Sequence, residues 1–124
     1  MRVAGLGFRA HASVASLRSA LHAAGGNSGT TGLSALSTAE DKAGAIALLQ
    51  LAAELGLPVV GVPLADLQGQ NAAVSSHVPA RYGGRSLAEA AALAAAGPGA
   101  WLLATRVVST DGLATAAIAE NTGL

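Results

Sequence analysis

The chain has 124 residues, a length typical of one domain, so we expect residues 1–124 to fold around one core. Seven basic and seven acidic side chains cancel, which excludes the basic surface of a nucleic-acid binder or a polybasic membrane anchor. Cysteine is absent, which excludes disulfides, thiolate nucleophiles and thiolate metal sites. The N-terminal apolar run is too short for a secretory signal, so we expect a cytoplasmic protein.

The first part of the chain predicts a strand, a helix and a second strand. Arg2 to Phe8 is a short apolar run with glycines, typical of a buried strand. Apolar residues at helical spacing predict a helix over Ser13 to Ala24. A glycine-rich loop over Gly25 to Gly32 follows, and Leu33 to Leu36 predicts the next strand.

A long apolar helix is expected in the middle of the chain, over Asp41 to Leu55, with Gly56 as its stop. Its capping pair is either S-x-x-E at 37–40 or T-x-x-D at 38–41. The apolar residues of this helix cover more than one stripe, which predicts that much of its circumference is buried. Pro58 to Val62 then predicts a strand covered on both faces.

The last part of the chain predicts an irregular segment, a helix and a hairpin. No period is visible from Gln68 to Arg85, and long irregular segments are often functional. Ser86 to Ala96 predicts a helix with an S-x-x-E capping box at its start. Ala100 to Val108 and Leu113 to Ala119 predict two strands, joined by the Asp-Gly turn of 109–112. This order predicts a three-layer α/β/α fold with a mixed, mostly parallel sheet of about five strands and a C-terminal antiparallel hairpin.

The segment Gly5–Ala10 is the first candidate site. Gly5 and Gly7 are expected in the turn between the first strand and helix, where Arg9 and backbone N–H groups would bind an anion. A turn without a ligand and a dinucleotide site of the G-x-G-x-x-G/A type are the alternatives. Lys42 is expected in the first turn of a helix, where it would oppose the helix dipole, so contact with an anionic ligand is favoured over chance placement.

The irregular segment holds a second group of candidates. Arg81 and Arg85 would bind carboxylates, with a solvated loop as the alternative. His77 and Glu89 are the weak candidates for catalysis, although His77 lacks an evident partner and Glu89 fits the capping box. No metal site is expected, because no Asp, Glu or Cys lies between His11 and His22, the other two histidines. No cofactor is expected either.

Four segments, taken in order, are similar to one known family. They are GLGFRAHAS, STAEDKAGAIALLQLAAELGLPVVGVPLADL, RSLAEAAALAAAGPGAWLLATRV and LATAAIAE. Over Val3 to Glu120 the chain resembles the CobE/CbiG C-terminal domain family of cobalamin biosynthesis, through the ordered set rather than one motif. Gly5, Gly7 and Arg9 match the opening of the family, and Lys42 matches the lysine of its second block.

The resemblance implies further ligand-binding positions toward the C-terminus. Arg106 matches the basic residue after the family's penultimate strand, and Thr115 matches the threonine of its last strand. The chain departs from the family at Ala45, where an acidic residue is often found, and at Ser76–His77, which replaces a serine–glutamate pair. Ser76 stays in the ligand-binding set, but acid–base roles are not carried over to these positions.

The family resemblance implies a domain that acts on precorrin intermediates, large rings with several acetate and propionate carboxylates. Relatives with two domains open a δ-lactone by hydrolysis and release acetaldehyde, and this chain resembles the stand-alone type. We therefore expect binding of an anionic precorrin or corrin intermediate, and contact with other enzymes of the pathway. Assistance of lactone opening and transfer of the intermediate are both left open, as is catalysis itself. The alternative is a small nucleotide-binding module that uses the Gly5–Ala10 turn.

Overall fold

The structure is a computed structural model, and it describes residues 1–25, 32–69 and 86–122. Its strands are β1 (Arg2–Phe8), β2 (Leu33–Ala39), β3 (Val59–Val62), β4 (Trp101–Val108) and β5 (Ala114–Glu120). Its helical segments are α1 (Val14–Gly25), the 3₁₀ turn η2 (Glu40–Lys42), α2 (Ile46–Leu55), α3 (Leu64–Gln68) and α4 (Leu87–Ala96).

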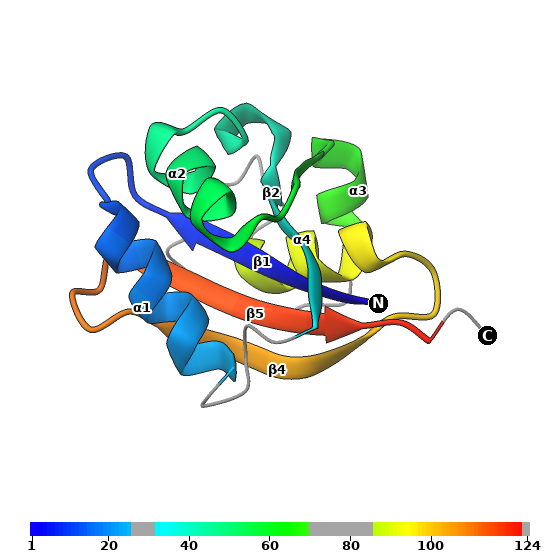
Figure 1. The fold of residues 1–124 in the computed structure, drawn as a ribbon. Coiled ribbons are helices and arrows are strands. Elements are labelled where there is room, and N and C mark those ends of the chain that lie inside the picture. Colours follow the sequence, from blue (N-terminus) through cyan, green and yellow to red (C-terminus); the bar gives the residue numbers. More distant parts are fainter. Residues whose placement is uncertain (26–31, 70–85, 123–124) are drawn as a thin grey trace.

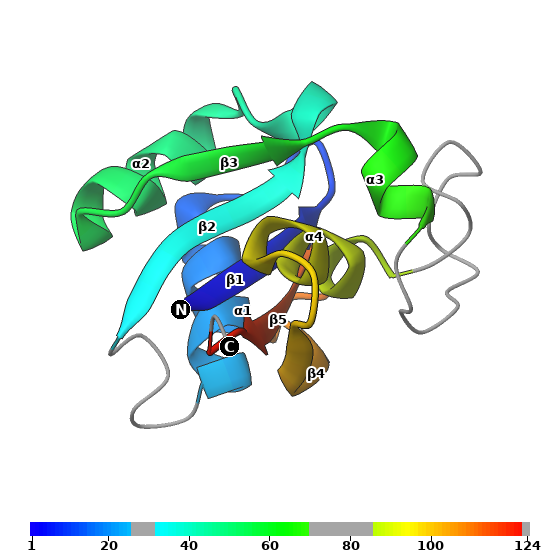
Figure 2. The same ribbon diagram turned by 90° about the vertical axis from the view of Figure 1, so that its right-hand side faces the viewer.

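The strands form one mixed sheet in the order β3-β2-β1-β5-β4. β1 pairs in parallel with β2, and β2 with β3, whereas β5 is antiparallel to both β1 and β4. Helices α1 and α2 cover one face of the sheet, and α3 and α4 cover the other (Figures 1 and 2). The predicted three-layer architecture with a C-terminal antiparallel hairpin is confirmed.

The two faces of the sheet are packed with side chains of different size. The face under α1 and α2 is filled by fully buried leucines, which are Leu6, Leu17, Leu21, Leu36, Leu48 and Leu51. On the opposite face Gly5 has Ser37 and Ala117 as its neighbours in register, and α4 above them is mostly alanine. Small side chains on both surfaces let α4 pack unusually close to the sheet.

The second strand is longer than its sequence predicts, and this overturns the expected helix caps. The strand continues past Leu36, so Ser37 and Thr38 lie inside β2. Their hydroxyls donate to carbonyl groups of β1, Ser37 to Ala4 at 3.4 Å and Thr38 to Leu6 at 2.7 Å. Both proposed capping pairs are therefore wrong, because these hydroxyls satisfy buried strand carbonyls instead of helix N–H groups.

The central helix starts later than predicted. The chain forms the η2 turn after β2, and α2 begins only at Ile46 instead of at Asp41. Its predicted stop is confirmed, since Gly56 adopts φ 68° and donates its N–H to the last turn. The prediction that much of the circumference of this helix is buried is wrong in part, because Ile46 is 75% and Leu49 is 47% exposed on its outer side.

β3 is an edge strand, and its predicted coverage on both faces holds only in part: Val59 packs against the core under α1 and α2, and Val62 is buried on the side of α3 and α4. Val60 and Gly61 are exposed in this edge strand. The short helix α3 that follows was not predicted, and only its last residue, Gln68, falls in the segment expected to be irregular. None of the helices in the described ranges is long and apolar enough to cross a bilayer.

Candidate functional site

The carboxyl ends of four strands lie at one edge of the sheet. β1, β2 and β3 are parallel, and β4 runs in the same direction because two antiparallel pairings separate it from β1. Helix α4 begins at this edge, since Leu87 and the N–H of Ala88 lie next to Gly7 near the end of β1. This end is termed the carboxyl edge, toward which the β1 arrow points in Figure 1. Ligands of open α/β sheets commonly bind there.

Gly5 and Gly7 lie inside β1 and not in a turn after it. A Cβ on Gly5 would stand 1.9 Å from the carbonyl oxygen of Ala88, and a Cβ on Gly7 would stand 2.8 Å from Oγ1 of Thr115. The glycines therefore make room for α4 and β5. The predicted turn over Gly5–Ala10 is wrong, and the dinucleotide fingerprint fails with it, because that fingerprint needs its glycines at the strand-to-helix turn.

Lys42 is anchored at the carboxyl edge. Its Nζ donates to the carbonyl oxygen of Phe8 at 2.9 Å and lies 5.1 Å from the centroid of the Phe8 ring. This contact places the ammonium beside the residue that precedes Arg9, so the structure brings these two predicted cations together. The predicted helical position is corrected, since Lys42 ends the η2 turn before α2 and the argument from a helix dipole does not apply.

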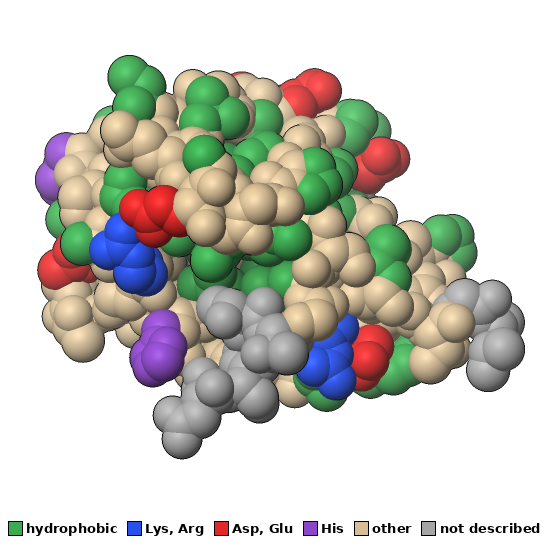
Figure 3. Space-filling view, viewed as in Figure 1, with side chains coloured by type: hydrophobic (Ala, Val, Ile, Leu, Met, Phe, Trp, Pro, Cys, Tyr) green, Lys and Arg blue, Asp and Glu red, His purple; other side chains and the backbone are tan. Residues whose placement is uncertain are grey.

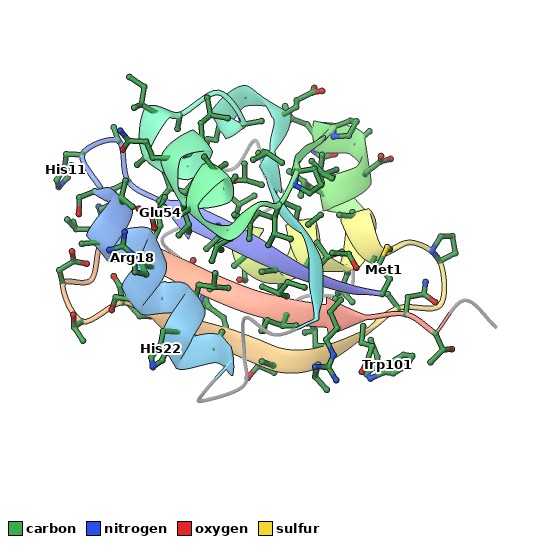
Figure 4. All side chains as sticks on the ribbon, in the orientation of Figure 1. Met1, His11, Arg18, His22, Glu54 and Trp101 are labelled. Atoms are coloured by element: carbon green, nitrogen blue, oxygen red, sulfur yellow. The ribbon has the colours of Figure 1, made fainter. Side chains whose placement is uncertain are left out.

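Arg9 begins the loop between β1 and α1, and it is exposed. Its N–H donates to the carbonyl of Leu113 at 2.9 Å, and its carbonyl accepts the N–H of Ala12 at 3.0 Å. The backbone of Arg9 is thus held on both sides while its guanidinium is accessible. His11 of the same loop lies at the end of the molecule opposite to Met1 (Figure 4).

Two hydroxyl groups lie on the α4 side of the carboxyl edge. Thr115 Oγ1 donates to the carbonyl of Gly7 at 3.4 Å. Ser86 Oγ accepts the N–H of Glu89 at 3.4 Å, which confirms the serine half of the predicted capping box, while the Glu89 carboxylate accepts the Arg106 N–H. The N-terminus of this helix is buried, since Ser86, Leu87, Ala88 and Glu89 are each at most 7% exposed.

Glu89 and Arg106 are in contact, but through the backbone of Arg106. Glu89 is only 2% exposed, and its Oε2 accepts the Arg106 N–H at 3.0 Å. The register of β4 against β5 shifts between Ala104 and Val107, so this N–H lies at an irregular part of the strand. The buried carboxylate stabilises that irregularity, which favours the structural alternative for Glu89. Arg106 itself is exposed, and it lies inside β4 and not after the penultimate strand as the resemblance implied.

The predicted cluster of the long irregular segment lies outside the described residues. Its members are Ser76, His77, Arg81 and Arg85. The ligand-binding roles of this cluster and the catalytic role of His77 stay predictions.

The described arginines differ in whether they form an ion pair. Arg2 pairs with Glu120 at 3.2 Å, and Arg18 pairs with Glu54 at 2.8 Å. The second pair lies on the face that α1 and α2 form, where charged side chains are few and scattered (Figures 3 and 4). Within the described part of the chain Arg9 and Arg106 make no ion pair. Their charges are therefore available to an anion.

Four side chains that sequence reasoning missed tie the β4–β5 hairpin to the start of α1. Asp111 Oδ1 accepts from Ser109 Oγ at 2.6 Å and from the Leu113 N–H at 3.0 Å. Asp111 Oδ2 accepts from Ser16 Oγ, which in turn lies 3.2 Å from Ser13 Oγ. Ser13, Ser16, Ser109 and Asp111 are termed the hairpin clasp. The Asp-Gly pair predicts the turn from sequence, but no pattern indicates its contact with a helix far earlier in the chain.

The hairpin clasp lowers the pKa of Asp111 from 3.8 to about 2, because Ser109, Ser16 and the Leu113 N–H donate to the carboxylate. The folded state therefore favours the ionised form, and this stabilisation is complete above about pH 4 and is lost as the pH falls through about 2. We expect the free energy of unfolding of wild type to fall over this interval more than that of Asp111→Asn, as measured by urea unfolding. A difference between the two proteins that does not vary with pH would contradict the assignment.

Two solved structures are similar to this chain over nearly its whole length. One is CobE, a protein from the cobalamin (vitamin B12) biosynthetic pathway, at 34% identity and a TM-score of 0.84, covering 98% of this chain and 90% of that one. The other is the cobalamin biosynthesis protein chiG from Agrobacterium tumefaciens str. C58, at 35% identity and a TM-score of 0.74, covering 98% and 99% of the two chains. A search of curated protein sequences found no match.

The family model described as "Cobalamin synthesis G C-terminus" matches residues 2–119. This range covers all strands and helices of the described residues, except that it ends one residue before the end of β5. Fold, sequence and family model agree, and the resemblance seen in the sequence is confirmed. The chain belongs to the CbiG C-terminal family of cobalamin biosynthesis proteins.

Proposed function

We propose that this protein binds an anionic precorrin or corrin intermediate at the carboxyl edge and carries it between enzymes of the cobalamin pathway. The solved relative CobE is described as a protein of that pathway, which supplies the class of ligand. Precorrins and corrins carry acetate and propionate carboxylates around the ring. A binding surface for such a ring needs several separated cations and N–H donors, since each carboxylate must exchange water for a charged or hydrogen-bonding partner.

The availability of Arg9 and Arg106 is the observation that carries this proposal. Both are exposed without an ion pair in the described residues, Arg9 just after β1 and Arg106 two residues before the end of β4, whereas the other two described arginines are paired. Lys42 adds a third cation, held against Phe8.

The described residues favour binding over hydrolysis by Glu89 and over nucleotide binding. A general base must reach the water that it activates, whereas the Glu89 carboxylate is buried and already accepts a backbone N–H. The nucleotide alternative depends on a glycine turn, and the two glycines are inside β1.

A comparison of charged and uncharged corrins tests the proposal. Cobyrinic acid, whose peripheral groups are free acids, is titrated into the protein and followed by visible absorbance and calorimetry. Cobinamide, in which those groups are amides, is the matched control. We expect binding of the free acid that weakens with added salt and much weaker binding of the amide, because the charges are accessible to solvent. Equal binding of both rings, or of neither, would end the proposal.

Replacement of Arg9 with alanine is expected to weaken the affinity for cobyrinic acid about tenfold, the effect of losing one charge-assisted hydrogen bond. Arg2→Ala is the control, because Arg2 starts the same strand at the opposite edge of the sheet and pairs with Glu120. This variant should keep the wild-type affinity. Calorimetric titration of both variants measures the difference, and an equal loss in the two would show that only net charge matters.

A further inference from the structure

The loop that carries Arg9 is held at both of its ends. At its start the Arg9 N–H donates to the carbonyl of Leu113 at 2.9 Å. At its end Ser13 caps α1, and the cap is reciprocal: the Ser16 N–H donates to Ser13 Oγ at 3.2 Å, and the Ser13 N–H donates to Ser16 Oγ at 3.3 Å. The conformation of residues 9–13 is therefore set by these two attachments.

One carboxylate connects the two attachments. Asp111 Oδ1 accepts the N–H of Leu113, the residue whose carbonyl holds Arg9. Asp111 Oδ2 accepts the hydroxyl of Ser16, the residue that completes the cap with Ser13. Both ends of the Arg9 loop thus depend on the same side chain, which comes from the hairpin turn between the last two strands.

The surroundings of Asp111 make this connection stiff. Ser16 is 1% exposed and Ser109 is 5% exposed, so the hydroxyls that donate to the carboxylate are fixed in the packed part of the protein. Ser109 Oγ also accepts the N–H of Ala114 at 3.1 Å, which attaches the turn to the start of β5. A second contact between hairpin and helix, from the Thr110 N–H to Ser19 Oγ at 3.3 Å, does not involve the Arg9 loop.

We propose that Asp111 is a positioning residue that fixes the backbone at Arg9 and so aims its guanidinium at a ligand carboxylate. This role rests on the proposed function, since Arg9 is the residue proposed to contact the ligand. Loss of the carboxylate frees Leu113 and Ser16 together, so Arg9 samples more orientations and binds its partner less well.

Hydrogen exchange tests the positioning without any ligand. In Asp111→Ala we expect the Arg9 and Ser13 amides to exchange about tenfold faster, the effect of about one lost hydrogen bond. Amides of β2 should keep their wild-type rates. Asp111→Asn should preserve slow exchange at Arg9, because its side-chain oxygen still accepts from Leu113, but not at Ser13, because its amide nitrogen cannot accept the Ser16 hydroxyl. Ser19→Ala, which removes the other contact between hairpin and helix, is the control and should leave both amides unchanged. Unchanged exchange at Arg9 in Asp111→Ala would overturn the proposal.

A double-mutant cycle between Asp111 and Arg9 tests whether the positioning serves binding. Asp111→Ala should weaken cobyrinic acid binding about threefold to tenfold in the wild-type background and should have no effect in Arg9→Ala. A merely structural role would lower affinity equally in both backgrounds and would overturn the assignment. If Arg9→Ala alone leaves the affinity unchanged, the proposed site fails. Asp111 then has no role in ligand binding, even if the Arg9 and Ser13 amides exchange faster in Asp111→Ala.

Discussion

Replacement of Gly5 with alanine is expected to lower the free energy of unfolding by about 3 kcal/mol or more, at the upper end of the range for overpacked cores. The added Cβ would stand 1.9 Å from the Ala88 carbonyl oxygen and 2.7 Å from the Ala92 nitrogen. Both are backbone atoms of α4, so no side chain can rotate away and the whole helix must move. The midpoint of thermal unfolding should fall by roughly 10 °C.

Gly44→Ala is the matched control for this prediction. Gly44 has nothing within 4 Å of an added Cβ, and it lies in the exposed turn between η2 and α2. Its substitution should change the free energy of unfolding by less than about 0.5 kcal/mol, as at most surface positions. Urea unfolding of the two variants measures the difference. Equal stability of Gly5→Ala and Gly44→Ala would show that α4 does not pack against β1 as closely as described.

The second large effect is expected at Glu89. Glu89→Ala removes the acceptor of the Arg106 N–H and leaves that donor without a partner beside a new void. The free energy of unfolding should fall by about 2 to 3 kcal/mol, since a buried polar group is unsatisfied and packed atoms are lost. Glu89→Gln keeps an acceptor at the same place and should lose clearly less. Equilibrium unfolding in urea separates the variants.

Glu54→Ala provides the matched control, because it also removes a carboxylate. Glu54 is exposed and pairs with Arg18 on the surface, so its loss should lower the free energy of unfolding by less than about 1 kcal/mol. An effect at Glu89 no larger than at Glu54 would contradict the structural role. A full loss of cobyrinic acid binding in Glu89→Gln at wild-type stability would do the same, because it would mean that the carboxylate acts on the ligand.

The order of strands and helices was predictable because it follows from local periodicity. Alternating short apolar runs and amphipathic segments place most elements of the fold, and the Asp-Gly pair at 111–112 places the final hairpin. Element ends were harder to predict where a polar residue had a partner in another strand. Thr38 is an example: its hydroxyl fits a helix cap locally, but it donates to the carbonyl of Leu6 in the neighbouring strand.

The candidate site was predictable in residue type but not in role. Arg9 and Lys42 do come together, because each follows a parallel strand that ends at the carboxyl edge. Gly5 was interpreted as part of a ligand-binding turn, since sequence does not show that a helix much later in the chain lies against it. The role of Asp111 was missed for the same reason, as its partner Ser16 lies in the first helix.

Binding of a polyacidic corrin by the carboxyl edge is the central claim, and mapping of backbone amide signals during a titration with cobyrinic acid tests it most directly. We expect the largest shifts at Arg9, the η2 turn, the first turn of α4 and the start of β5. The amino end of the sheet, around Arg2 and Glu120, should be unaffected. Shifts concentrated around that opposite end, or no shifts at saturating ligand, would contradict the account.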